Sequence, residues 1–237
     1  QKEATTWNDN PQAALVIANL ITSSPSWVIP AGNVSITLGD SALTLPEGDY
    51  ASGMFTTTLP ADKASGSTLN VRNSSALPSW GAVISQYVAE TSAVKPHSIP
   101  DLSITKEILV GTATANGMKW TSATSMALGS SVKVQLTIVA KRDMDYVTIV
   151  DQRAACFEPT DQLPGYISSQ GLSFYRENRD SQTDIFISRL PKGTYVLTYD
   201  LSTNNAGTFT SGIATIQSQM TPALTAHSGA DPISVSK

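Results

Sequence analysis

The sequence contains little cysteine, little charge and no long apolar run. Cys156 is the single cysteine of 237 residues, so no internal disulfide can form. Charged residues make up only 14% of the chain, and the net charge is -4 with no basic stripe. Because phosphate binding needs clustered Lys and Arg, we expect no nucleic-acid partner. The longest apolar run, residues 13–18, is far shorter than the roughly 20 residues that span a bilayer.

No recognisable export signal is present either. The chain starts at Gln1, and no signal peptide follows it, so we expect a fragment of a longer precursor whose signal lies elsewhere. A β-rich chain with one cysteine differs from disulfide-stapled eukaryotic ectodomains. This composition favours a secreted protein of the periplasm or outer cell envelope of a bacterium.

Metal-binding and catalytic patterns are missing as well. His97 and His227 are the only histidines, and neither has a His, Cys or carboxylate at ligand spacing. We predict that both are solvated loop residues and that no metal or cofactor is bound. Asp143, Asp145 and Asp151 lack calcium-loop spacing. Without a nucleophile–base pair or a phosphate loop, the chain is predicted not to be an enzyme.

One short motif points to an esterase. Gly39-Asp40-Ser41-Ala42 resembles the nucleophile block of GDSL-type hydrolases. Those enzymes need an α/β scaffold and an Asp-x-x-His, whereas Leu224-Thr225-Ala226-His227 lacks the Asp. Since Gly, Asp and Ser are turn formers, we interpret the motif as a turn between strands and keep the esterase as a third hypothesis.

The first structured segment is predicted to be a helix. Asn10 suits the N-cap, Pro11 suits the first helical position, and the apolar stretch 13–21 follows. This stretch is apolar on nearly every face, which is typical of a helix surrounded by other helices. We therefore expect a missing N-terminal neighbour.

The rest of the chain has the pattern of β-strands. We predict short strands at 34–38, 50–59, 68–71 and 82–87, with a turn cluster at 60–66. A domain boundary is predicted near 94–100, where Pro96 and Pro100 interrupt any ladder.

Beyond this boundary, apolar and polar residues alternate more clearly. The residues 132–138 and 195–201 have the period of half-buried antiparallel strands, and 160–171 is predicted to be a long surface loop. The fold class is therefore all-β: a short N-terminal helix followed by two β-sandwich domains.

Several blocks in the second half resemble one family. They are residues 145–159, 172–180, 190–195, 207–209 and 212–217, and together they resemble the C-terminal domain of bacterial α-macroglobulins. Residues 68–73 with 78–82 resemble the β-domain that follows the helical toroid of that family, and residues 3–7 with the helix resemble the last toroid helix. The resemblance implies a toroid stub at 1–22, a β-domain at 23–103 that can be incomplete, and a terminal macroglobulin-like sandwich at 104–237.

The family traps proteases, so the resemblance implies a C-terminal structural and docking module of a protease inhibitor. Its partners would be the upstream domains of the same polypeptide and, through the full-length protein, a target protease. The alternative hypothesis is a cell-surface adhesion or glycan-binding module, because a sandwich fold alone does not fix function. Trp27, Trp80 and Trp120 could form a carbohydrate platform, although core packing is the simpler interpretation.

The family also suggests where chemistry is absent and where contacts lie. Its thioester forms within Cys-x-Glu-Gln, whereas Cys156-Phe157-Glu158-Pro159 ends in proline, so no thioester can form there and Cys156 is predicted to be buried. In thioester-bearing relatives, a tyrosine of the terminal domain screens the thioester from water. Tyr175 is the first candidate for this position and Tyr166 the second. With Arg176 they lie in the segment 160–180, which we predict to be the working surface or a cap on the sandwich.

Overall fold

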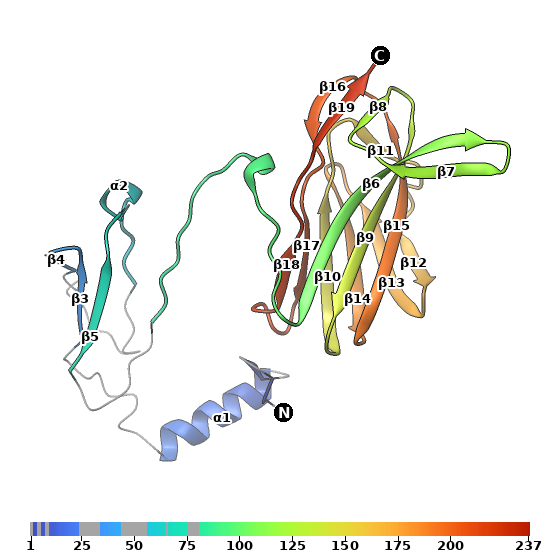
Figure 1. Ribbon diagram of the computed structural model, residues 1–237. Coiled ribbons are helices and arrows are strands. Elements are labelled where there is room, and N and C mark those ends of the chain that lie inside the picture. Colours follow the sequence, from blue (N-terminus) through green and yellow to red (C-terminus); the bar gives the residue numbers. More distant parts are fainter. Residues whose placement is uncertain are drawn as a thin grey trace. The chain divides into compact units, whose positions relative to one another are not determined.

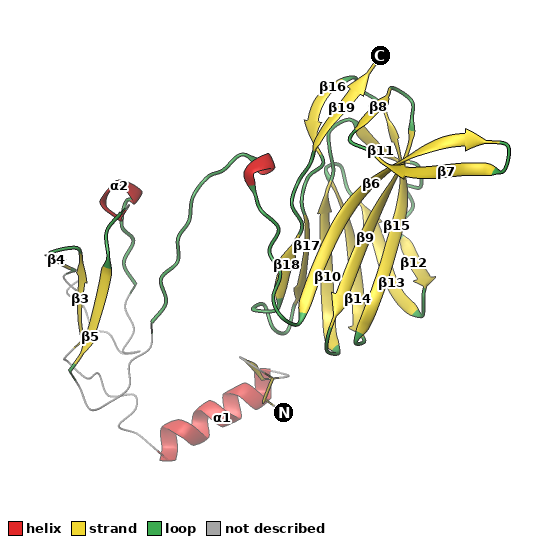
Figure 2. Cartoon of the chain, viewed as in Figure 1, coloured by secondary structure: helices red, strands yellow, loops and turns green. Residues whose placement is uncertain are grey.

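The structure, a computed structural model, describes residues 2–3, 6–7, 10–23, 34–43, 56–64, 66–74 and 81–237. Strands form most of the described structure (Figure 2), and a helix lies near the N-terminus, which confirms the predicted fold class. The chain divides into two compact units, one formed by Gln1–Asn8 with Tyr87–Lys237 and the other by Asp9–Gln86. The domain boundaries predicted at 22/23 and 103/104 stay predictions.

The smaller unit contains the helix and a short antiparallel sheet. The helix α1 (Asn10–Ser23) starts at the predicted N-cap residue, and Leu15 and Ile17 on it are more than half exposed. The sheet has the order β4 (Ser41–Ala42), β3 (Val34–Leu38), β5 (Leu69–Asn73). Gly39 makes the β3–β4 turn at a φ of +58°, a conformation that glycine adopts without a steric penalty.

In the first half, the strand predicted at 82–87 is not formed, and the described end of the strand predicted at 50–59 is not formed either. Residues 56–60 and 81–90 lie outside any strand, and the helix α2 (Ala61–Ala64) stands within the predicted turn cluster. The remainder of the predicted strand 50–59 lies outside the described residues. Ile84 is 88% exposed, so the apolar pattern of 82–87 is not matched by burial. A strand needs a neighbour to satisfy its backbone, and none pairs with 81–90 in the described structure.

The larger unit is a β-sandwich of two antiparallel sheets (Figure 1). The first sheet has six strands, in the order β12 (Gly165–Ser169), β13 (Leu172–Asn178), β14 (Gln182–Leu190), β10 (Met144–Gln152), β17 (Ala214–Ser218), β18 (Thr225–His227). The second has five, in the order β11 (Phe157–Pro159), β15 (Gly193–Thr203), β9 (Ser131–Ala140), β6 (Leu102–Thr114), β7 (Gly117–Ser122).

Two smaller sheets and a helical turn complete this unit. β16 (Gly207–Thr210), β19 (Pro232–Ser236) and β8 (Ser125–Ala127) form a three-stranded sheet in which β19 and β8 are parallel. β1 (Lys2–Glu3) pairs with β2 (Thr6–Trp7), and a 3₁₀ turn spans Thr91–Ala93. Among the described helices, none is long and apolar enough to cross a membrane.

One continuous core lies between the two main sheets. Val134 and Leu136 of β9 and Leu197 and Tyr199 of β15 are buried, whereas the residues between them are more accessible. The same core receives Ile149 of β10 from the opposite sheet. The alternation predicted for 132–138 and 195–201 is therefore confirmed, because each strand has one face on this core.

The predicted loop 160–171 is wrong in its second half. Gly165–Ser169 forms the edge strand β12, which pairs in register with β13. Gln170 and Gly171 have φ values of 54° and 78° and make the tight turn between the two strands. Both values are those of a two-residue hairpin turn whose twist matches that of the flanking strands. Within this strand, Tyr166 and Ser168 lie on the exposed face, whereas the polar residues 160–162 precede the strand.

Candidate functional site

Three aromatic side chains lie side by side on the outer face of the six-stranded sheet. Tyr166 on β12 pairs in register with Tyr175 on β13, and Tyr175 pairs with Phe186 on β14. The rings of Tyr166 and Tyr175 are 5.1 Å apart in an edge-to-face arrangement, and those of Tyr175 and Phe186 are 6.4 Å apart. We name Tyr166, Tyr175 and Phe186 the aromatic row. Such ring pairs stabilise each other by about 0.5–1.5 kcal/mol beyond their buried area.

The aromatic row is open to solvent. Tyr166 is 82% exposed and Phe186 is 39% exposed, while Tyr175 between them is half-buried. The same line of paired residues continues across the sheet through Thr148 on β10, Gln217 on β17 and Thr225 on β18. The outer face of this sheet therefore has an aromatic half and a polar half.

Arg176 does not belong to this face. Neighbouring residues of a strand point to opposite sides of the sheet, so Arg176 is directed inward while Tyr175 faces out. Its guanidinium is nearly buried and forms an ion pair with Asp161 at 2.7 Å. Asn178 on the same strand donates a hydrogen bond to the backbone oxygen of Asp161 at 2.6 Å. Arg176 thus anchors the loop that precedes β12, and the structure brings together only the two predicted tyrosines.

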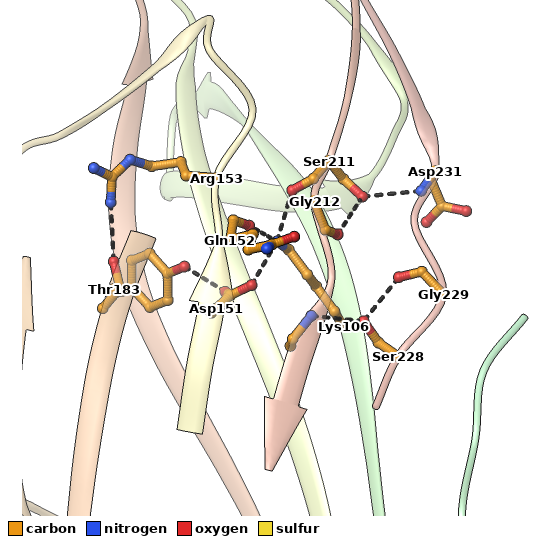
Figure 3. Close-up of polar contacts among 12 residues, drawn as sticks. Lys106, Asp151, Gln152, Arg153, Thr183, Ser211, Gly212, Ser228, Gly229 and Asp231 are labelled. Carbon is orange, nitrogen blue, oxygen red and sulfur yellow. Dashed lines mark hydrogen bonds and ion pairs between the residues drawn. The ribbon is translucent and has the colours of Figure 1, made fainter. Parts of the chain in front are cut away.

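Inside the sandwich, the two sheets are joined by a buried polar network (Figure 3). Lys106 on β6 forms an ion pair with Asp151 on β10 at 2.6 Å, and both side chains are almost fully buried. The Tyr199 hydroxyl on β15 donates to the other Asp151 oxygen at 2.5 Å. Burial raises the pKa of Tyr199 well above its ordinary value, and the neighbouring Asp151 charge and hydrogen bond raise it further.

The Lys106 ammonium has an acceptor for each of its three N–H groups. Besides Asp151, it donates to the backbone oxygens of Gln152 at 2.6 Å and Ser211 at 2.7 Å. Gly212 allows these two chain segments to approach, because a Cβ at that position would overlap the Gln152 backbone. Because buried polar groups are stable only when they are hydrogen-bonded, these complete contacts let the network brace the sandwich.

An open hollow of about 350 Å³ lies beside this network. Gln152, Arg153, Gln182, Phe209 and Gly212 contribute to its lining. The Arg153 guanidinium, however, already donates to Thr183 at 3.1 Å and to the backbone oxygens of Arg179 and Asp180. The charged group best placed to bind a ligand is thus used to hold the β13–β14 turn.

The other candidate residues from the sequence lie outside the aromatic row. Cys156 is buried as predicted, in the turn before β11, and desolvation raises the pKa of its thiol. Trp120 lies under Lys133, whose ammonium is 4.4 Å from the ring centre, while Trp27 and Trp80 lie outside the described residues. Ser41 is exposed at the start of β4.

His97 and His227 are not two separate loop residues, which corrects the prediction. The structure places them directly opposite each other across an isolated antiparallel bridge. In the described part of the chain, no group of three or more His, Cys, Asp or Glu is assembled that could hold a metal ion.

Sequence reasoning missed Phe186 and the partners of Asp151. The alternation of Ile185, Phe186 and Ile187 could have shown that Phe186 faces outward. Its neighbour Tyr175, however, follows only from the pairing of β13 with β14. Lys106, Asp151 and Tyr199 come from three strands that are distant in sequence, and no local signal connects them.

Comparison with known proteins gives a consistent picture of the family. Residues 102–223, just over half of the chain, match the family described as bacterial alpha-2-macroglobulin MG10 domain. This match begins at the first residue of β6 and runs through β17. No curated protein matches the chain significantly.

Solved structures of bacterial alpha-2-macroglobulins share the fold. Salmonella alpha-2-macroglobulin reacted with methylamine is 22% identical, with a TM-score of 0.53, and the match covers 92% of this chain and 14% of that one. Native Escherichia coli alpha-2-macroglobulin from domain MG7 to the C-terminus is 19% identical, with a TM-score of 0.53 and coverage of 89% and 34%. The E. coli protein activated by porcine elastase is 19% identical, with a TM-score of 0.52 and coverage of 96% and 22%.

This chain spans between 14% and 34% of the length of those three relatives. The family model that matches residues 102–223 identifies the family, and the fold shared with the solved structures agrees with it. The chain belongs to the bacterial alpha-2-macroglobulin family.

Proposed function

We propose that this chain is the C-terminal structural and docking module of a macroglobulin-like protease trap. Members of the family are non-enzymatic protease inhibitors, and one solved structure is of the E. coli relative activated by porcine elastase. The residues of this chain fit a supporting part in such a trap. Cys156 is buried and is followed by Pro159 where a thioester motif has glutamine, so the covalent chemistry of any trap would come from other domains.

The observation that carries the docking proposal is the aromatic row. Exposed aromatic side chains on a rigid sheet lose little conformational entropy when they are covered, and they are enriched at the centres of protein interfaces. Tyr166 projects furthest into solvent, and Tyr175 supports it from the next strand. The proposed occupants are the upstream domains of the same polypeptide, and the target protease is engaged through the full-length protein.

The roles of the individual residues follow from their exposure. Tyr166 is the principal contact and Tyr175 its support, and either would be the tyrosine that screens a thioester. Arg176 acts as a positioning residue that holds the loop before β12 through Asp161. With a net charge of -4 and one buried cysteine, the chain suits a periplasmic or outer-envelope protein and is not suited to nucleic acid.

The test compares tyrosines in the full-length protein. Tyr166→Ser and Tyr175→Ser should reduce inhibition of elastase, whereas Tyr87→Ser is a matched control, because Tyr87 is 81% exposed and lies outside the sheets. Thermal melting measured on the same samples should change little for Tyr166→Ser, since that ring is mostly in water. If both sheet variants inhibit elastase as well as the control does, the docking proposal is wrong.

A glycan-binding or adhesion module is the second candidate. The aromatic row adjoins Thr148 and Gln217, so apolar and hydrogen-bonding groups lie next to each other, as they do in sugar sites. Against it, the Tyr166 and Tyr175 rings are inclined by 67°, which breaks the flat platform on which sugar rings stack. Binding of this chain on a glycan array, abolished by Tyr166→Ser, would favour this candidate over the docking module.

A further inference from the structure

The only two histidines of the chain are held face to face by the backbone. His97 and His227 exchange two backbone hydrogen bonds, each with an N···O distance of 2.9 Å. In such an antiparallel pair, the two side chains lie on the same side of the ladder. The imidazole ring centres are 5.7 Å apart, with an interplanar angle of 31°. His97 is exposed and His227 is partly exposed, so both rings can be reached from solvent.

The protonation pattern of His227 leaves one ring nitrogen free to bind. Its Nδ1 lies 3.0 Å from the backbone oxygen of Ser228, which can only accept a hydrogen bond. The neutral ring therefore carries its proton on Nδ1 and its lone pair on Nε2. Ser228 is itself fixed, since it is buried and its amide donates to Ala214 at 2.9 Å. An N–H···O=C bond of this kind orients histidines that ligate metals in proteins.

The separation of the rings fits a shared ion. A transition-metal ion about 2.0–2.1 Å from a ring nitrogen lies roughly 3 Å from the ring centre, so two imidazoles on one ion have centres up to about 6 Å apart. The observed 5.7 Å lies within this limit. The chelate would need only side-chain rotations, because the backbone bridge already aligns the two residues.

We propose that His97 and His227 form a two-histidine site for a divalent first-row transition ion of the kind that imidazole prefers, such as Zn²⁺ or Cu²⁺. Water would complete the coordination, since no third His, Cys, Asp or Glu is gathered there among the described residues. His97 lies in the segment that leads to β6, and His227 ends the edge strand β18. The ion would thus clip this segment to the edge of the six-stranded sheet.

The first experiment measures binding to this chain after metal removal with EDTA. Titration calorimetry with ZnCl₂ should show one site, with the affinity lowered roughly tenfold or more in His97→Gln and in His227→Gln, because each loses the chelate. Zn²⁺ should also raise the melting temperature of the wild type more than that of either variant. Absence of binding by the wild type, or equal affinity in the wild type and both variants, would overturn the proposal.

A second measurement does not depend on how the variants fold. Electron paramagnetic resonance of the wild-type chain with one equivalent of CuCl₂ should show coupling to two imidazole nitrogens. Since the chain has no other histidines, both nitrogens would come from this pair. A spectrum with one imidazole nitrogen, or with oxygen ligands alone, would show that the two rings do not share the ion.

Discussion

At the residue scale, the buried carboxylate of Asp151 links the two sheets of the sandwich. Asp151 is fully buried, and its two oxygens are taken by Lys106 from β6 and Tyr199 from β15, both in the opposite sheet. A buried charge is tolerated only when its partners are complete, so loss of one partner costs much more than loss of a surface ion pair. Substitution of any of the three residues is therefore expected to destabilise the sandwich.

Tyr199→Phe tests this network, and its effect should depend on pH. Near neutral pH, the loss of a hydrogen bond to a carboxylate should cost about 1.5–3 kcal/mol of unfolding free energy. The pKa of Tyr199 is raised on folding, so its contribution is complete below about pH 10, the unfolded value, and is lost as the pH rises further. The gap between wild type and variant should thus narrow above about pH 10, by at most roughly 1.4 kcal/mol per pH unit.

Urea unfolding at about pH 8 and about pH 11 measures this gap. Tyr195→Phe is the control on the same strand, because the Tyr195 hydroxyl donates to the Pro191 backbone oxygen at 3.2 Å and does not contact Asp151. A gap between wild type and Tyr199→Phe that stays constant over this range would contradict the assignment of the Tyr199 proton.

At the scale of elements, alternation along one strand could be predicted from the sequence, whereas the pairing between strands could not. β9 and β15 were predicted because each has one face on the core, which produces strict alternation. Residues 82–87 were predicted as a strand without such alternation, and no strand pairs with them in the described structure. Tyr166 and Tyr175 were identified as candidates one by one. Their contact with Phe186 and the inward direction of Arg176 depend on the register of β12, β13 and β14. The local sequence does not encode that register.

Gly212→Ala should disturb the contact between the β16–β17 connection and the end of β10. Gly212 has a φ of +75°, and an added Cβ would press on the Gln152 backbone, which is fixed by hydrogen bonds to Ile213 and Lys106. Left-handed strain of about 1–2 kcal/mol adds to this overlap, so the loss of unfolding free energy should exceed about 2 kcal/mol.

Gly171→Ala provides the matched control. Gly171 has a φ of +78°, but an added Cβ there meets no atom within 4 Å, so only the backbone strain applies. Urea unfolding of both variants separates the two contributions. Equal losses would mean that the approach of Gly212 to Gln152 does not stabilise the sandwich.

At the scale of the whole molecule, the chain consists of two compact units, and the hydrophobic core of the described residues lies in the larger one. The helix α1 belongs to the unit Asp9–Gln86, whereas the core of the sandwich starts at Leu102. Leu15, Ile17, Leu20 and Ile21 of α1 are all at least 44% exposed. An apolar surface of this kind commonly marks an interaction site, in agreement with a contact to another part of the full-length protein.

Deletion of residues 1–21 should leave the melting of the sandwich almost unchanged. None of the described side chains of α1, residues 11–23, belongs to the sandwich core, so removal of the helix is expected to take no buried area from that core. Thermal unfolding followed by circular dichroism, compared with the intact chain, measures the effect. A large loss of the sandwich transition would show that the helix stabilises that unit after all.

The strand order of the sandwich also has a consequence for how the chain folds. β9 pairs with β6 and β15, and β10 pairs with β14 and β17, so these two consecutive strands belong to different sheets and each has a partner far along the chain. Contacts between distant residues make folding slow, because the entropy of closing a long loop is lost before the strand contacts form. A chain cut between β14 and β15 would leave β9 without one neighbour and β10 without another. Both sheets therefore need strands that follow β14 before they are complete, and the sandwich is expected to finish folding only when β15 and β17 pair.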